Sequence, residues 1–173
     1  MDLRYPIGPF NFEGTLSEQE RSALIDQIAA TPAEMSAAVA GLDDVQLDTE
    51  YRPEGWTVRQ VVHHVPESHL HSYIRFKLAI TEDEPVIKPY FEDRWAKLED
   101  ALNAPVDLSL NLLDTLHSRW VWFLRSLKPS DFQRAFRHPE LGVVSLDKNV
   151  ALYAWHGRHH VAHITSLRDR MGW

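Results

Sequence analysis

The sequence predicts an all-α protein, a four-helix bundle with an extended N-terminal segment and short extra elements. Four long stretches carry apolar residues at helical spacing, whereas few stretches alternate as strands do. The 173 residues contain no internal repeat, low-complexity tract or linker that would divide the chain. We therefore expect a single domain over residues 1–173, large enough to bury a core without disulfide bonds.

Local signals place the helix boundaries. Ser17 with Glu20, and Thr57 with Gln60, match the capping box, in which side chains at a helix start bond free backbone N–H groups. Pro32 should kink or break the first helix. The expected long helices cover residues 17–42, 57–80, 107–127 and 145–173.

The connections between these helices differ in length. Residues 1–16 and 48–56 are typical of extended or loop structure, and HPELG at 138–142 could join two short strands. The connection before the third helix has about 26 residues and one short helical pattern, 91–101. It is too long for a tight hairpin, so it could cross the bundle and let the second and third helices run parallel.

Composition argues against several classes of function. The net charge is −7, from 25 acidic and 18 basic residues, which disfavours a phosphate-binding surface and so a nucleic-acid partner. No stretch of 18 uncharged apolar residues exists, so we expect no membrane partner. The start lacks the apolar run of a signal peptide, and cysteine is absent, which excludes disulfides and thiolate metal sites. We expect a cytoplasmic protein.

Histidine is unusually clustered in this chain. Eight of the ten histidines lie in two short clusters. Two histidines four residues apart on a helix place both imidazoles on one face, close enough to share a metal ion. The first cluster contains His63, His64, His69 and His71, and the second contains His156, His159, His160 and His163.

The helical wheel selects one histidine pair in the last helix. At about 100° per residue, His156 and His160 lie in the middle of the apolar stripe, beside Tyr153 and Ile164. His159 lies towards the edge of that stripe. The inner pair is therefore His156 and His160. Two histidines rarely complete a zinc site, so we expect a third protein ligand, with an open position if the site is catalytic.

The second helix offers three candidates for the third ligand. Pro66 should bend this helix, which weakens a wheel argument. His64 lies at the border of the apolar face, in line with a polar stripe, and His63 is turned further away. His69 is more central to the apolar face. The residues alone favour His64 over His63 and leave His69 open.

Other residues near the clusters have an ordinary structural explanation. A lone histidine in an amphipathic helix is usually a core or surface residue. Trp56 could form a wall of the site, although a core role is the default. Arg75 and Arg158 could meet an anionic substrate, although solvated arginines are commoner. The remaining histidines are expected to be structural or to orient a ligand, and they are His63, His117, His138, His159 and His163.

The same residues carry a family resemblance. The segment YRPEGWTVRQVVHHVPESHLHSYIRFKLAITED, with YPIG near the start and YAWHGRHHVAHITSLRDRMGW at the end, resembles the YfiT-like proteins of the DinB-like superfamily. The likeness covers nearly the whole chain, including LHSRW in the third helix and FRHPE before the fourth. It implies a bundle of up-down-down-up topology, a homodimer, and one divalent metal ion per subunit in a three-histidine site.

The resemblance also implies which residues bind the metal. The family's ligands are the second histidine of an HH pair and both histidines of an HxxxH motif, which fall here on His64, His156 and His160. The sequence departs from the family pattern in two places. Pro66 stands where relatives resemble HHLADSH, so the local helix geometry could differ. Arg158 replaces a histidine, which changes the charge at the mouth of the site.

Two enzymatic functions follow from the resemblance, and a third function without catalysis is the alternative to both. We favour transfer of a thiol such as bacillithiol to an electrophilic small-molecule substrate, with the metal holding sulfur as thiolate. This chemistry suits a chain without a clear general base, for which Glu67 is the only candidate. The alternatives are hydrolysis by metal-bound hydroxide and a non-catalytic bundle in which the metal only pins two helices. Zinc is the expected metal, and nickel is also compatible with imidazole ligands.

Overall fold

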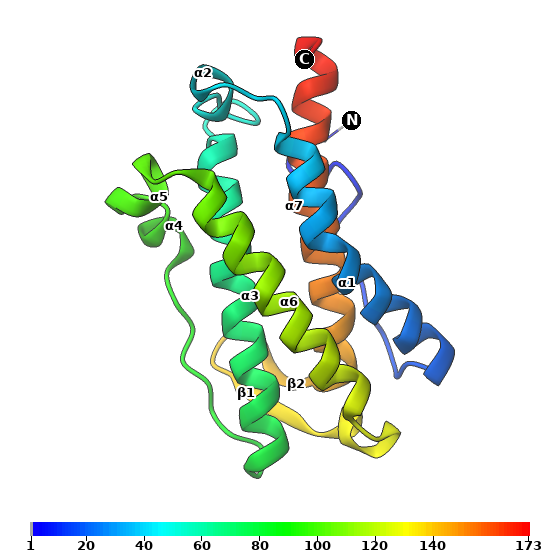
Figure 1. Cartoon of the computed structure of the whole chain (residues 1–173). Helices are drawn as coiled ribbons and strands as arrows, with labels where there is room; N and C mark the ends of the chain where they lie inside the picture. The colour runs from blue at the N-terminus through cyan, green and yellow to red at the C-terminus, as the bar shows by residue number, and fades with distance from the viewer. Residues whose placement is uncertain (1) are drawn as a thin grey trace.

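The structure, a computed structural model, describes residues 2–173. Figure 1 shows α1 and α7 running in one direction and α3 and α6 in the other, which is the up-down-down-up arrangement. The predicted all-α four-helix bundle is therefore confirmed. Its long helices are α1 (Glu18–Val39), α3 (Val58–Thr81), α6 (Val106–Ser126) and α7 (Leu146–Met171).

The long helices begin where capping side chains satisfy their free N–H groups. Both predicted capping boxes are present, one at the start of α1 and one at the start of α3. Asp43 and Gln46 form a further box at the start of α2 (Asp44–Leu47), a short helix not predicted from the sequence. α1 ends at Val39, a little earlier than expected, and continues without a break through Pro32.

The connection between α3 and α6 runs back along the bundle and allows these two helices to run parallel (Figure 1). It holds two short helices, α4 (Glu92–Trp95) and α5 (Glu99–Asn103), where one was predicted. A short 3₁₀ helix, η1 (Pro129–Gln133), follows α6. The predicted turn at 138–142 joins β1 (Ala135–His138) and β2 (Gly142–Ser145), which pair antiparallel.

A buried polar layer separates two apolar clusters. One cluster gathers around Phe76 and Trp120, and the other around Met35 and Ile164. Helices α3, α6 and α7 each contribute residues to both clusters. On each of these helices, a histidine lies between the part that belongs to one cluster and the part that belongs to the other. These histidines are His69 on α3, His117 on α6 and His160 on α7, and all three are buried.

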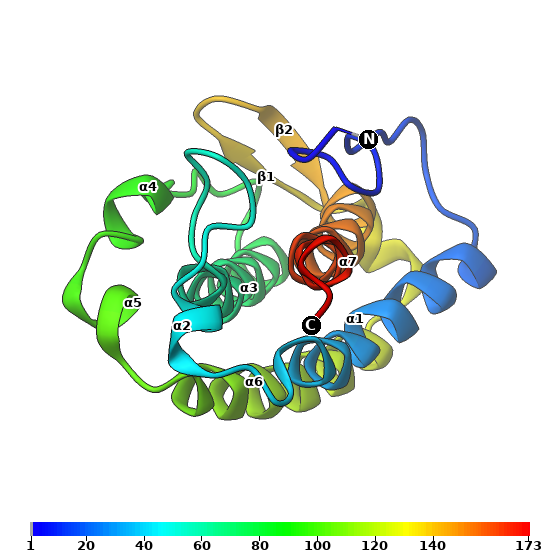
Figure 2. The same cartoon turned by 90° about the horizontal axis from the view of Figure 1, so that it is seen from above.

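The arrangement of the helices leaves one face of the α3–α7 pair free for the site. Seen from above (Figure 2), α1 and α6 lie on one side of this pair. The loop before α3, the β-hairpin and the N-terminal segment lie on the other side. Within residues 2–173, no helix is long and apolar enough to cross a membrane.

Candidate metal centre

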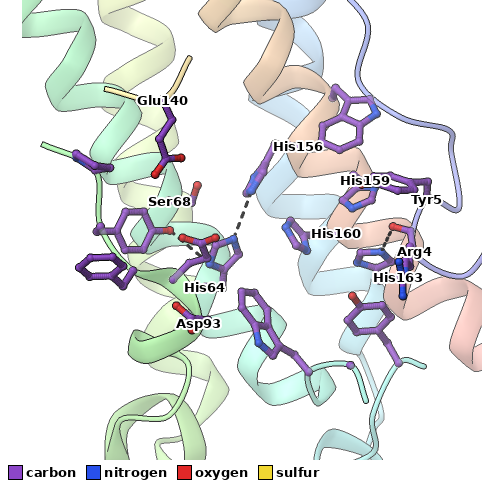
Figure 3. Close-up of a pocket in the computed structure, with 18 of the residues that line it drawn as sticks. Arg4, Tyr5, His64, Ser68, Asp93, Glu140, His156, His159, His160 and His163 are labelled. Atoms are coloured by element: carbon purple, nitrogen blue, oxygen red, sulfur yellow. Dashed lines mark hydrogen bonds between the residues drawn. The ribbon is translucent and has the colours of Figure 1, made fainter. Parts of the chain in front are cut away.

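Three histidines converge between α3 and α7. The ring nitrogens that His64, His156 and His160 offer all lie within 4.8 Å of one another. Figure 3 shows His64 and His156 pointing towards each other, with their Nε2 atoms 3.4 Å apart. The ring centroid of His160 lies 4.9 Å from that of His64 and 4.5 Å from that of His156. The structure thus brings together the three residues singled out from the sequence.

Burial keeps these imidazoles neutral at neutral pH. Removal from water disfavours the charged ring, so burial lowers the pKa of His64 to about 3. Burial, and then the neighbouring histidines, also lower the pKa of His156 and of His160 well below the ordinary value. A neutral imidazole has a free lone pair, which is the form that binds a metal.

The residues present fit a divalent metal ion. The Nδ1 atom of His160 is buried and has no hydrogen-bond partner among the described residues. The Nε2 atoms of His64 and His156 lie 3.4 Å apart, so both rings can direct a nitrogen at one shared ion. Three imidazoles are a ligand set that zinc accepts, with a fourth position left for a water or substrate.

Two other histidines of α3 have different partners. His63 is turned away from the group, with its ring nitrogens 2.7 Å from Ser109 Oγ and 3.1 Å from the Ala104 carbonyl oxygen. His69, the competing candidate, lies behind His156 rather than beside His64, with its Nε2 3.0 Å from His156 Nδ1. Neither belongs to the three-histidine group.

The three histidines lie in the wall of an open pocket of about 760 Å³. Three residues considered for contact with a substrate or for orienting a ligand also line it, namely Trp56, Arg75 and His159. The Trp56 ring lies 4.7 Å from the His64 ring, measured between centroids. Arg158 is exposed and does not line the pocket, and its Nε donates to the carbonyl of Ala154 in its own helix.

Glu67 lies on α3 one turn from His64, half-buried and outside the pocket lining. Burial, and then the negative charge of Asp100, raise the pKa of Glu67 to about 7. The raised pKa is compatible with proton transfer at neutral pH. Glu67 does not itself line the pocket, so the structure adds no support to its candidacy as a general base.

The pocket contains residues that the sequence did not reveal. The Tyr90 hydroxyl lies 3.4 Å from His64 Nδ1, so it can orient the ring of this ligand. The N-terminal segment reaches the outer side of α7, where the His163 ring donates to the Arg4 carbonyl oxygen at 3.2 Å (Figure 3). Both residues lie outside periodic helices, so no pattern in the sequence marks them as neighbours of the histidines.

Carboxylates also line the pocket, on segments that connect the long helices. No motif ties them to the histidine clusters, because they come from three separate loops and short helices. They are Glu54, Glu92, Asp93 and Glu140.

A helical bundle with three histidines gathered at an open pocket is typical of proteins that bind a metal ion between their helices. Comparison with known proteins identifies the family. The model of the DinB superfamily matches residues 27–164. The chain belongs to the DinB superfamily. The predicted resemblance to YfiT-like proteins is therefore confirmed.

Individual relatives support the same assignment. A protein of Bacillus mycoides (strain KBAB4), named as a candidate metal-dependent hydrolase, is 57% identical over 99% of both chains. A protein of Bacillus cereus (strain B4264) with the same description is 55% identical over 99% of both chains. YfiT from Bacillus subtilis, described as a probable metal-dependent hydrolase with an unusual four-helix-bundle topology, is 46% identical. Its structure has a TM-score of 0.98 and covers 100% of this chain and 99% of its own.

Proposed function

We propose that this protein is a divalent-metal-dependent enzyme that activates a small thiol for transfer to an electrophilic substrate. The observation that carries the proposal is the group of three neutral imidazoles, from His64, His156 and His160, at an open pocket of about 760 Å³. A pocket of this size accommodates a complete small-molecule ligand rather than a water molecule alone.

The metal would supply Lewis acidity, which lowers the pKa of a bound thiol and keeps the sulfur in its nucleophilic thiolate form. His64, His156 and His160 would hold the ion at the wall of the pocket. The Trp56 ring packs beside His64 and would shield that side of the site from water. In the transfer, the thiol would lose its proton to water in the open pocket and its sulfur would form a bond to the electrophilic carbon. The bond from that carbon to the leaving group would break, and the leaving group would keep the electron pair.

Charged side chains around the pocket bear on the choice of thiol. Arg4, Arg52 and Arg75 line it and can bind carboxylates of an anionic thiol such as bacillithiol. Because the described chain has no cysteine, the sulfur nucleophile must come from a second small molecule.

Hydrolysis is the second candidate function, and two observations favour it. Carboxylates such as Glu92 and Glu140 line the pocket and can accept a proton from an attacking water. The relatives from Bacillus mycoides and Bacillus cereus are described as candidate metal-dependent hydrolases, and YfiT is described as a probable one.

One experiment separates the two functions. Zinc-loaded, untagged protein is incubated with a model electrophile in the presence and absence of bacillithiol, and with esters and amides in the absence of thiol. We expect an S-conjugate by mass spectrometry, lost in His156→Ala. Hydrolysis products formed without thiol, with no conjugate, would establish the second candidate. Zinc binding without either product would leave only a metal-pinned bundle.

A further inference from the structure

A chain of hydrogen bonds runs from the metal-site histidine His156 across the whole bundle. His156 Nδ1 lies 3.0 Å from His69 Nε2, and His69 Nδ1 lies 2.8 Å from His117 Nε2. His117 Nδ1 lies 2.7 Å from the carbonyl oxygen of Ile28. The chain therefore joins α7, α3, α6 and α1 in that order. His69 and His117, its middle members, are completely buried.

The end of this chain on α1 depends on a proline. In an α-helix, the carbonyl of Ile28 would accept from the N–H of residue 32. That residue is Pro32, which has no N–H, so the Ile28 carbonyl lacks the usual donor of an α-helix. His117 supplies the missing donor. Pro32, which was expected to kink or break α1, thereby leaves the Ile28 carbonyl oxygen able to accept a hydrogen bond from another helix in the interior of the bundle.

The carbonyl anchor fixes where each proton lies. A carbonyl oxygen only accepts, so the proton of His117 must be on Nδ1, and in the neutral ring Nε2 is then an acceptor. His69 must accordingly donate from Nδ1 and accept at Nε2. His156 must in turn donate from Nδ1, which leaves the lone pair of its Nε2 free. That atom is the one that lies 3.4 Å from His64 Nε2.

We propose that His117 and His69 are positioning residues, which hold His156 in the Nδ1–H tautomer and direct its Nε2 lone pair at the metal. The proposal rests on the proposed function in that His156 is taken as a ligand. The role is that of a second layer of hydrogen bonds around a metal ligand, which fixes its tautomer and its ring orientation. Here the layer is a relay of two imidazoles ending on a backbone carbonyl.

Only this arrangement leaves His156 able to bind at Nε2. If the relay ran in the opposite sense, His156 Nδ1 would accept and its Nε2 would carry the proton, which blocks ligation. Loss of the anchor at Ile28 would make both senses available. Because the carbonyl anchor sets this direction even in a purely structural network, the zinc affinity of relay variants distinguishes a positioning role from a structural one.

The first test reads the tautomers directly. Metal-free protein with ¹⁵N-labelled histidine is studied by long-range ¹H–¹⁵N NMR at neutral pH. We expect His156, His69 and His117 to carry the proton on Nδ1. A proton on Nε2 of His156 or of His69 would overturn the proposal. Because this readout needs no metal, it decides the relay even if the protein binds no zinc and the proposed function fails.

The second test changes the relay without touching a ligand. His117→Phe removes both the donor to Ile28 and the acceptor for His69, whereas the amide of His117→Gln can supply one of each. Zinc affinity is measured by competition with a chromophoric chelator, on variants that retain the wild-type helical circular dichroism. We expect His117→Phe to weaken zinc binding by about 10- to 100-fold and His117→Gln to restore most of it.

The matched control is His63→Phe. It removes another buried histidine with two hydrogen bonds, to Ser109 and Ala104, but none to the relay. We expect this variant to keep the wild-type zinc affinity. Wild-type affinity in His117→Phe, or an equal loss in His63→Phe, would show that the relay does not position His156.

Discussion

At the scale of single residues, adjacent histidines have separate roles. His160 joins the three-histidine group, whereas the ring of His159 stacks on Trp155 with centroids 4.3 Å apart. We predict that His160→Ala abolishes stoichiometric zinc binding and that His159→Ala retains most of it, as measured by elemental analysis of the dialysed protein. His156→Ala should behave as His160→Ala does. Zinc retained by both of these variants would refute the ligand assignment.

Glu67 gives the protein a pH-dependent stability. Its pKa is about 7 in the folded protein, mainly because of burial, against 4.5 for the ordinary group. The folded state therefore favours the protonated carboxyl, and stability from this group falls as pH rises from about 4.5 through about 7. Glu67→Gln cannot ionise, so at pH 8 it should be more stable than the wild type by about 1 kcal/mol, discounted for partial exposure.

Urea unfolding of both proteins at pH 4 and pH 8 measures this effect. The advantage of Glu67→Gln should be largest at pH 8 and should disappear at pH 4. A difference that is the same at both pH values would mean that Glu67 does not titrate with a raised pKa. Loss of catalytic activity in this variant is not expected, because Glu67 lies outside the pocket.

At the scale of elements, local signals predicted the long helices but not what joins them. The capping boxes at Ser17 and Thr57 are local, so sequence is enough to place these helix starts. The capping box at Asp43 is not followed by a long apolar pattern, because α2 is only four residues long, so it does not predict a helix by itself. Pro32 could not be interpreted from sequence, because the partner of the Ile28 carbonyl comes from α6, and only tertiary packing supplies it.

The packing of α1 on α7 requires a residue without a side chain at position 157. A Cβ at Gly157 would lie 2.6 Å from Thr31 Oγ1 and 2.7 Å from Thr31 Cγ2. Gly157→Ala gains helix propensity of about 1 kcal/mol, but overpacking costs about 1–3 kcal/mol. We predict a net loss of unfolding free energy on the order of 1 kcal/mol, measured by denaturant titration.

A double-mutant cycle tests the cause of that loss. Thr31→Ala removes both close atoms, so the double variant should recover much of the stability lost in Gly157→Ala. If Gly157→Ala alone were as stable as the wild type, that result would contradict the claim that α1 approaches α7 too closely at Thr31 to admit a side chain at position 157.

At the scale of the whole molecule, the site joins parts of the chain that the sequence keeps far apart. The length of the connection after α3 indicated that α3 and α6 could run parallel. The histidine spacing identified His156 and His160, whereas only the family resemblance selected His64 over His69 as the third residue that meets them. The pocket rim could not be predicted. Arg4, Tyr90 and Glu140 come together there only because the connecting segments fold over the free face of α3 and α7.

Because the three histidines belong to α3 and α7, a bound ion should stabilise the whole bundle. Zinc at 100 times its dissociation constant should add about 2.7 kcal/mol, provided that the unfolded chain does not bind it. We predict a higher melting temperature with zinc, reversed by a chelator and absent in His64→Ala. An equal rise in His64→Ala would place the stabilising ion elsewhere.

The most direct measurement is a crystal structure of the zinc-loaded, untagged protein, with the ion located by anomalous scattering. The account predicts one zinc per chain, bound by nitrogen atoms of His64, His156 and His160 at about 2.0–2.1 Å, with its remaining position open to the pocket. Zinc bound by other histidines, or no zinc between α3 and α7, would contradict it.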